Sequence, residues 1–345
     1  MITVVGAGII GLCTAFELAD RGEKVQIFDP HPTSGATRFA GGMLAPIAEV
    51  QFQQDLLFPL MLQSAQLYPD LIARVRKFSD LDTGYDTNGT LVVAADRADA
   101  QHLSDLAHYR PAGFNADDIE RLTVRAARRC EPRLSPDLAG VVSIPGDHQV
   151  YPRLLAAALL DALRNRGVTV VEKQAPETDN AIICTGLGAA NHVPLRPVYG
   201  DILRLACPTP LVSKVIRGWV NDRAVYIIPR PDGELCIGAT SREDSRTRPA
   251  VDGVYQLLKD AIRIVPGIEE CELIEASVGA RPGSPDDLPF FGWLSGTHQL
   301  LSSGYFRHGI LLAALAGKTA AEVYLGAEIP AHFRACDPYR FSQDP

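Results

Sequence analysis

Apolar positions near the start of the chain follow the order strand, helix, strand. Residues 2–5 form a continuous apolar run, which suits a strand buried on both faces of a parallel sheet. Residues 9–21 carry apolar side chains at helical spacing, and Gly22 ends the predicted helix. Residues 24–28 then predict a second strand. This order is typical of a β-α-β unit in an α/β domain.

The rest of the chain alternates between long helical patterns and short β-like runs. Helical spacing returns over residues 55–80 and 154–166, and residues 300–326 read as a strand, a glycine-rich turn and a helix. No internal repeat is evident. The shorter elements are predicted as a helix at 251–265 and as strands at 90–93, 168–172, 181–186, 199–205, 224–229 and 234–240.

The alternation of long helical patterns with groups of short β-like runs indicates two interleaved domains. A chain of 345 residues exceeds the size that a single hydrophobic core usually reaches. We predict an α/β, Rossmann-like dinucleotide domain interleaved with an α+β domain that contains a mixed, largely antiparallel sheet. The first domain is assigned residues 1–83, 148–207 and 276–345, and the second is assigned residues 84–147 and 208–275.

Composition and charge narrow the class of protein. The chain is 46% hydrophobic and 21% charged, as in compact globular proteins. A net charge of −8 without a basic stripe argues against a nucleic-acid partner. The longest apolar stretch, near residues 310–317, is too short for an integral membrane segment, and the N-terminus does not resemble a signal peptide. We therefore expect a cytoplasmic protein, and its oligomeric state, including a homo-oligomer, is left open.

The seven cysteines are scattered singly along the chain. No CxxC motif and no paired histidine spacing suggests a metal site. We expect buried thiols in a reducing compartment rather than disulfides or metal ligands.

A glycine motif marks the first candidate site. Gly6, Gly8 and Gly11 form G-x-G-x-x-G directly after the first predicted strand, where the backbone can approach a pyrophosphate at a helix N-terminus. Asp29 ends the second strand and can accept hydrogen bonds from ribose hydroxyls. An acid there disfavours a 2′-phosphate, which leaves NAD or FAD. Residues 37–46 are mostly small and could lie against a flat ring system, although alone they could form only a flexible loop.

Five blocks of sequence resemble the D-amino-acid oxidase superfamily of flavoenzymes, and within it the glycine oxidase family of thiamine biosynthesis. They extend from residue 2 to about residue 325, and the last three in this order are the most specific. The blocks are the glycine-rich start, the AGGML-x-P run at 40–46, residues 226–230 with 238–240, residues 279–282 with 289–292, and residues 304–312.

The resemblance implies FAD as the cofactor of the first domain. The FAD should be noncovalent, because related sarcosine oxidases carry a flavin-linking cysteine a few residues before the position of Ser284 and this chain has none there. Arg38 stands where the family usually has a small residue, and an adenine contact near Ala175 or Pro176 is left open. The implied contacts are Gly6, Gly8, Ile9, Ile10 and Gly11 at the pyrophosphate, Asp29 and Pro30 at the ribose, Ala36, Thr37, Gly41, Gly42 and Met43 along the isoalloxazine, Tyr305, Phe306, Arg307, His308, Gly309, Ile310 and Leu311 near its pyrimidine edge, and Gly186.

Two arginines supply the candidate substrate site. A guanidinium binds a carboxylate bidentately and stays charged when desolvated. Arg281 and Arg307 have near-apolar, glycine-flanked surroundings, unlike the solvated-looking cluster of Arg125, Arg128 and Arg129. The resemblance implies that Arg281 pairs with a substrate carboxylate, that Tyr226 donates a hydrogen bond from its hydroxyl, and that Arg307 assists.

Structural roles compete with these assignments. From the residues alone, Tyr226 reads better as an ordinary strand aromatic, Arg281 could form an interdomain ion pair, and Arg307 could be a structural arginine at a helix N-terminus. His308 is not assigned as a base, because the reaction needs none if the amine arrives neutral. Asp147 and His148 read as a turn and cap rather than a dyad.

The predicted function is FAD-dependent oxidative deamination of glycine or another small amino acid, such as sarcosine or a small D-amino acid. Hydride transfer to flavin N5 would give an imine, and O₂ would give hydrogen peroxide, with a role in thiamine thiazole biosynthesis. One alternative is a D-amino-acid or secondary-amine dehydrogenase that passes electrons to a quinone or carrier. Another is a non-catalytic flavin-binding subunit of a larger assembly. The AGGML run makes a nicotinamide-linked dehydrogenase the least favoured reading.

Overall fold

A six-stranded sheet forms the first of two layers of structure in the computed structural model, which describes residues 1–51, 54–109, 115 and 118–342. Its strands are parallel except for β15, which runs antiparallel to β16. This arrangement confirms the Rossmann-like prediction. The strand order is β15 (Phe290–Trp293), β16 (His298–Ser303), β9 (Asn180–Ile183), β1 (Ile2–Val5), β2 (Val25–Phe28) and β8 (Thr169–Val171).

Four helices pack with this sheet: α1 (Ile9–Asp20), α2 (Phe58–Val75), α5 (Pro152–Asn165) and α7 (Gly309–Tyr324). Helix α1 is apolar almost all round because it lies against both α5 and α7. Gly317 allows α7 to approach closely, since a Cβ there would lie 2.7 Å from the carbonyl carbon of Cys13. Helix α2 holds the start of α7: the Ser64 hydroxyl donates to the Leu311 carbonyl at 2.6 Å, and the Tyr68 hydroxyl donates to the Ile310 carbonyl.

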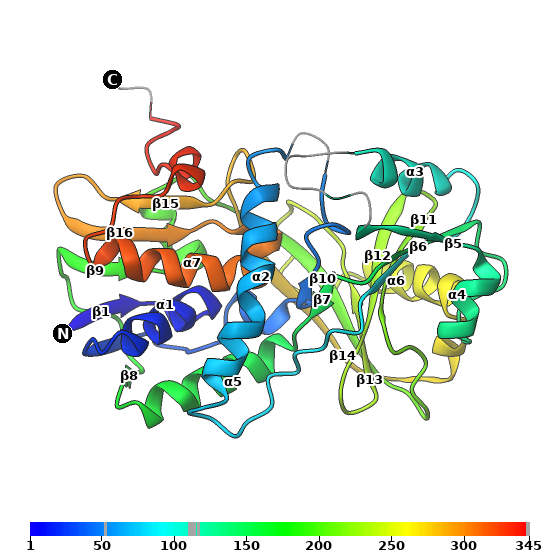
Figure 1. Ribbon diagram of the computed structural model, residues 1–345, viewed down its shortest axis with the longest axis horizontal. Helices are drawn as coiled ribbons and strands as arrows, with labels where there is room; N and C mark the ends of the chain where they lie inside the picture. Colours follow the sequence, from blue (N-terminus) through cyan, green and yellow to red (C-terminus); the bar gives the residue numbers. More distant parts are fainter. Residues whose placement is uncertain (52–53, 110–114, 116–117, 343–345) are drawn as a thin grey trace.

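An eight-stranded sheet forms the second layer, on the right in Figure 1. Only the β11–β4 pair is parallel, so the sheet is mixed and largely antiparallel, as predicted. Helices α3 (Ala100–His108), α4 (Val124–Cys130) and α6 (Val251–Ile264) accompany it. The strand order is β14 (Glu272–Gly283), β10 (Arg196–Ala206), β13 (Glu234–Gly238), β12 (Arg223–Pro229), β11 (Val215–Val220), β4 (Thr90–Ala94), β6 (Gly140–Ile144) and β5 (Glu120–Leu122).

The two faces of this larger sheet have different neighbours. One face carries Ile216, Ile227 and Ile237, which pack in one core cluster with Leu257 and Ile264 of α6. We call the other face the inner face. It meets residues 39–48 of the first domain, where Met43, Ala45, Ile47 and Ala48 pack against side chains of β4 and β6. The inner face therefore lies against the segment that follows the dinucleotide motif.

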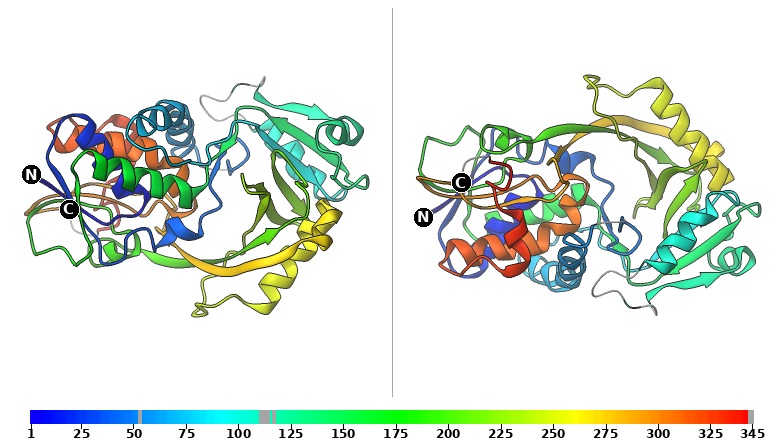
Figure 2. Two further views of the ribbon diagram at one scale, coloured as in Figure 1. Left: turned by 90° about the horizontal axis from the view of Figure 1, so that it is seen from below. Right: turned by 90° about the horizontal axis from the view of Figure 1, so that it is seen from above.

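Strands β10 and β14 link the two parts of the molecule. They pair along their whole length at one edge of the larger sheet. Their far ends reach back toward the six-stranded sheet, as the two views in Figure 2 show. Both strands belong to the larger sheet, so a boundary drawn by sheet membership would fall near residues 195 and 284, rather than at 207 and 276 as expected from sequence. The division into an FAD domain and a substrate domain stays a prediction.

Short elements fix the segment between the two sheets. Strands β3 (Met43–Leu44) and β7 (His148–Gln149) form a two-stranded ribbon that pins this segment to the chain before α5. The other short elements among the described residues are 3₁₀ helices of three to six residues: η1 (Ala36–Phe39), η3 (Gly186–Asn191), η4 (Pro266–Glu270), η5 (Phe306–His308) and η6 (Ala331–Cys336).

The prediction that every cysteine is a free thiol was wrong for one pair, since Cys207 and Cys271 form a disulfide. These residues follow β10 and precede β14, whose ends pair Ala206 with Glu272, so strand pairing brings the two thiols together. Their 64-residue separation gave no sign of this contact. Of the free cysteines, four are buried and Cys130 is exposed.

Within the part of the chain that the structure describes, no helix is both long and apolar enough to cross a bilayer.

The disulfide can be tested by counting thiols. The denatured, unreduced protein should show five free thiols with a thiol-specific reagent, and seven would contradict the structure. Cys271→Ser should lower the free energy of unfolding by about 2–4 kcal/mol in denaturant titrations, because the crosslink restricts the unfolded chain. Cys130→Ser, at an exposed free cysteine, is the matched control and should change it little.

Candidate functional site

The predicted dinucleotide motif lies at the carboxyl ends of β1, β2 and β9, where ligands bind in open α/β sheets. Two of its glycines allow close packing. A Cβ on Gly6, whose φ is +104°, would lie 2.5 Å from the Cys184 carbonyl oxygen, and a Cβ on Gly11 would collide with the Gly6 carbonyl. Gly8 is different, because a Cβ there would meet only the Thr37 hydroxyl at 3.5 Å. The backbone at Gly8 is thus left open for a ligand.

The donor groups here fit an FAD pyrophosphate and ribose. Helix α1 begins without a side-chain cap, so its first turn presents N–H groups and the positive end of the helix dipole. The Ile9 N–H already donates to the Thr37 hydroxyl at 2.9 Å, so the following N–H groups of the first turn are the ones left for a pyrophosphate. Asp29 accepts from the N–H groups of Ala7 at 2.7 Å and His31 at 2.8 Å, and its half-buried carboxylate can accept further bonds.

The other predicted cofactor residues gather at the same edge of the sheet. Gly186 follows β9, residues 36–43 include η1 and β3, and residues 305–311 include η5 and the start of α7. Among the described residues, the buried hydroxyl of Thr185 next to Gly186 has no hydrogen-bond partner. The Tyr305 side chain packs in the core with its hydroxyl on Ser302, so only its backbone is available to a ligand. Arg38 is exposed, which explains why a large residue is tolerated there.

Tyr226 lies on the inner face of the large sheet, in contact with the segment after η1. A Cβ on Gly41 would lie 3.0 Å from the Tyr226 hydroxyl, and a Cβ on Gly238 of β13 would collide with it. Both glycines therefore make room for the phenol. Arg230, which directly follows β12, fixes this contact. Its guanidinium donates to the Gly41 carbonyl and to the Val150 carbonyl at 3.3 Å.

Arg281 reaches the same region from β14. Gly200 of β10 makes space for it, since a Cβ there would collide with the Arg281 guanidinium. Arg281 donates to the Thr240 carbonyl at 3.3 Å and forms no ion pair within the described part of the chain. The interdomain ion pair that competed with the substrate role is therefore not seen there. Burial lowers the pKa of Arg281. Arg307 lowers this pKa further, while Tyr226 and Asp201 oppose the change. The guanidinium nevertheless stays protonated at working pH.

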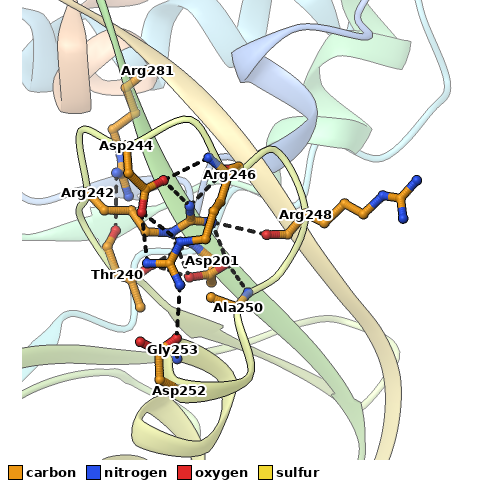
Figure 3. A network of polar contacts seen from close by, with 10 residues as sticks. All are labelled: Asp201, Thr240, Arg242, Asp244, Arg246, Arg248, Ala250, Asp252, Gly253 and Arg281. Carbon is orange, nitrogen blue, oxygen red and sulfur yellow. Dashed lines mark hydrogen bonds and ion pairs between the residues drawn. The ribbon is translucent and has the colours of Figure 1, made fainter.

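A polar network holds the carbonyl that Arg281 contacts (Figure 3). Asp201 is fully buried and accepts from the Thr240 hydroxyl at 2.6 Å and from Arg242 at 3.1 and 3.3 Å. Although burial raises its pKa, the bonds from Arg242 and Thr240 hold the pKa of Asp201 below its usual value. Asp244 lies at the half-exposed rim of the network, where its carboxylate forms an ion pair with the Arg242 guanidinium at 2.7 Å. Asp201 thus fixes Thr240 and, through it, the position of Arg281.

Arg307 lies in η5, which contacts β14, and it is tied to a residue that the sequence reasoning missed. Its guanidinium forms an ion pair at 3.0 Å with Glu49, and the other oxygen of Glu49 contacts the guanidinium of Arg217. The Arg217 and Glu49 side chains are each only 7% exposed, whereas Arg307 is 25% exposed. The three residues form one buried cluster at the inner face.

The turn that presents Glu49 is held by Asp147. The buried Asp147 carboxylate accepts from the N–H groups of Ile47 at 3.2 Å and Ala48 at 2.6 Å. Burial raises the pKa of Asp147 to about 7, while those two bonds oppose the rise. The contacts fit the predicted cap role. His148 belongs to β7, and burial lowers its pKa.

His308 is buried beside this cluster and is neutral. Burial, Arg307 and Arg217 together place its pKa well below the usual value. A neutral imidazole whose pKa is this low is a poor proton acceptor near neutral pH, which agrees with a reaction that needs no base. Burial also raises the pKa of Tyr226, with Arg281, Arg230 and Arg307 acting against the rise, so the phenol stays protonated and can donate a hydrogen bond.

The structure thus brings Tyr226, Arg281 and Arg307 together, and it places the predicted arginine cluster of α4 on an exposed surface. Glu49, Arg217 and Arg230 were missed. One signal was available for Arg217: in the run VIRGWV it shares a strand face with Val215 and Trp219, so a charge sits where a half-buried strand places apolar side chains. Glu49 gave no such signal, because its role depends on a fold contact with β11.

Comparisons with known proteins show the family and the fold of this chain. A family model described as DAO, FAD dependent oxidoreductase, matches residues 1–323. The chain is 31% identical to a glycine oxidase of Geobacillus kaustophilus over 93% of this chain and 92% of that protein. The crystal structure of glycine oxidase from that organism superimposes with a TM-score of 0.87 at 31% identity, covering 98% of both chains.

Two further relatives carry other names. A bifunctional protein ThiO/ThiG of Trichormus variabilis is 29% identical over 93% of this chain, which spans 52% of that protein. The crystal structure of iminodiacetate oxidase from Chelativorans sp. BNC1 has a TM-score of 0.84 and 26% identity, covering 98% of this chain and 99% of that one.

Asp201→Asn tests the link between the buried network and Arg281. Loss of the carboxylate should free Thr240 and misplace Arg281, which should weaken acetate binding about tenfold in calorimetric titrations. Asp244→Asn, on the half-exposed rim of the same network, is the matched control and should leave the affinity within about twofold, because a partly exposed pair contributes little. Equal affinities in the two variants, both folded by circular dichroism, would show that Asp201 does not position Arg281.

Proposed function

This chain belongs to the DAO family of FAD-dependent oxidoreductases, and we propose that it oxidises glycine or another small amino acid, such as sarcosine or a small D-amino acid. It is an FAD-dependent amino-acid oxidase of the glycine oxidase type. Similarity to a protein named ThiO/ThiG supports a role in thiamine biosynthesis, with formation of the thiazole as the proposed step.

The observation that carries the proposal is the carboxylate clamp on the inner face. Arg281 has no carboxylate of its own among the described residues, so its fork of N–H donors is free to bind a substrate carboxylate. The neutral Tyr226 hydroxyl can donate a further hydrogen bond to the same group. The Tyr226 ring lies against Gly41, in the segment after η1 along which the isoalloxazine is proposed to bind, and Arg281 is near enough to oppose the rise of the Tyr226 pKa.

The clamp also explains why a small amino acid would react without a catalytic base. FAD, when bound, would accept the hydride that leaves the substrate Cα, and O₂ would then be reduced to hydrogen peroxide. The residues of this chain would hold the carboxylate, orient Cα and exclude water. Positively charged Arg281 and Arg307 also disfavour a protonated amine, so they favour the neutral amine from which a hydride can leave.

The proposed cofactor contacts follow from the same edge of the six-stranded sheet. The N-terminus of α1 would hold the pyrophosphate, Asp29 the ribose, and residues 41–43 with the start of α7 the ring system. These roles rest on the open backbone at Gly8, the spare acceptor capacity of Asp29 and the unpartnered Thr185 hydroxyl.

The experiment that tests the function is a panel of amino acids with peroxide detection. The purified holoenzyme should release hydrogen peroxide with glycine, sarcosine or a small D-amino acid. Reduction of a dye without peroxide would indicate a dehydrogenase that serves a quinone or carrier. No turnover with any amine, in either assay, would favour the non-catalytic flavin subunit.

Arg281→Ala should raise the KM for glycine by about 100-fold or more, because the substrate carboxylate would be desolvated without its partner. Arg125→Ala, on the exposed surface of α4, controls for the loss of an arginine and should leave the KM unchanged. Steady-state kinetics of both variants measure the difference. Normal glycine kinetics in Arg281→Ala would contradict the clamp.

A further inference from the structure

We propose that Arg217 forms a second anion subsite beside the carboxylate clamp, so that the enzyme favours amino acids that carry two carboxylates. This inference rests on the proposed function and names a substrate class for the same site. The second carboxylate could belong to an N-carboxymethyl group or to an acidic side chain, and the experiment below separates these two sources.

Strand pairing places Arg217 next to the clamp. Arg217 of β11 lies directly opposite Tyr226 of β12, so the two side chains are neighbours on the inner face. On its other side Arg217 pairs with Val92 of β4, over which the turn with Glu49 packs. Arg217 therefore lies between Tyr226 and the Glu49 turn, one strand away from Tyr226 and on the opposite side of Tyr226 from β14, which carries Arg281.

The guanidinium of Arg217 is buried but only partly used. One terminal nitrogen contacts Glu49, and among the described residues its Nε–H has no hydrogen-bond partner. A buried charged donor without a partner is costly, and it needs an acceptor such as a water, an ion or a ligand group. The Nε–H groups of Arg166 and Arg230 are unmatched as well, so the Arg217 donor points to a ligand through its place beside Tyr226.

The charges around Tyr226 also leave a surplus. Arg217, Arg281 and Arg307 carry positive charge, whereas Glu49 is the only carboxylate that contacts any of the three within the described part of the chain. His308 and Tyr226 are neutral, and Arg230 is bound to the carbonyls of residues 41 and 150 and to Gln149. One substrate carboxylate on Arg281 would leave one cation in excess. A second carboxylate on Arg217 would balance it.

Glu49 sets the strength of this subsite. Its carboxylate bridges Arg217 and Arg307, so it competes with a second substrate carboxylate for the same guanidinium groups. Removing its charge should free both arginines. Loss of the Arg217 charge should therefore weaken binding of the second carboxylate, and loss of the Glu49 charge should strengthen it. A cluster with only a structural role would not show these opposite effects.

Ligands that cannot be oxidised at an amine test the subsite without turnover. Oxydiacetate and methoxyacetate differ in one carboxylate placed as in an N-carboxymethyl group, and succinate and butyrate differ in one placed as in an acidic side chain. Calorimetric Kd values on the holoenzyme should show about tenfold or greater preference for the dicarboxylate in at least one pair, as expected for a partly desolvated charge pair. The pair that shows the preference identifies the source of the second carboxylate.

Three variants separate the subsite from general electrostatics. Arg217→Gln should reduce the dicarboxylate preference to within about threefold, Arg217→Lys should keep most of it, and Glu49→Gln should increase it. Arg125→Gln, at an exposed site, should leave it unchanged. Because Glu49→Gln tests the subsite with Arg217 present, the proposal stays testable if Arg217→Gln does not fold.

The outcome is distinguishable from failure of the proposed function. Equal affinities for both members of each pair in the unaltered protein, or a preference that survives Arg217→Gln, would overturn the subsite even if glycine is oxidised. Absence of turnover in the amino-acid panel would instead refute the oxidase function, whichever ligand binds more tightly.

Discussion

The contact between residues 39–49 and the inner face of the large sheet is the constraint on which the site depends. It joins the segment that follows the dinucleotide motif to the strands that carry Tyr226, Arg217 and Arg281. Bonds from Arg230 and the β3–β7 ribbon fix one end of this segment, and Asp147 fixes the other. Glycines at positions 41 and 238 make the approach possible, because any side chain there would displace the Tyr226 phenol. The proposed cofactor site and the proposed carboxylate site therefore meet where residues 39–49 contact the inner face, a contact that we call the seam.

The electrostatics of that seam follow from where its arginines lie. A buried guanidinium must find an anion or lose much of its favourable hydration. Arg242 has Asp201, and Arg307 and Arg217 share Glu49, but Arg281 has only a backbone carbonyl. The missing anion is the physical basis for assigning a carboxylate substrate to Arg281. Arg217 also has a donor without an acceptor, and a second carboxylate would supply that acceptor in the proposed subsite.

Local patterns predicted most of the fold. The helices α1, α2, α5 and α7 follow apolar spacing, and the glycine motif placed the cofactor edge because its geometry is local. The Cys207–Cys271 bridge was missed for a different reason. It depends on the long pairing of β10 with β14, a contact between segments far apart in sequence that apolar alternation alone does not specify. Within the site, Tyr226, Arg281 and Arg307 were identified through family resemblance. Arg217 and Glu49 became visible only when β11 and the turn after β3 were seen side by side.

The central claim is that a flavin and a carboxylate clamp share one site and act together on a small amino acid. Anaerobic mixing of the holoenzyme with glycine, with the flavin absorbance followed in a stopped-flow instrument, tests this most directly. The oxidised flavin band is expected to bleach at a rate that saturates with glycine and to return when oxygen is admitted. A flavin band that stays unchanged with glycine, sarcosine and small D-amino acids would contradict it.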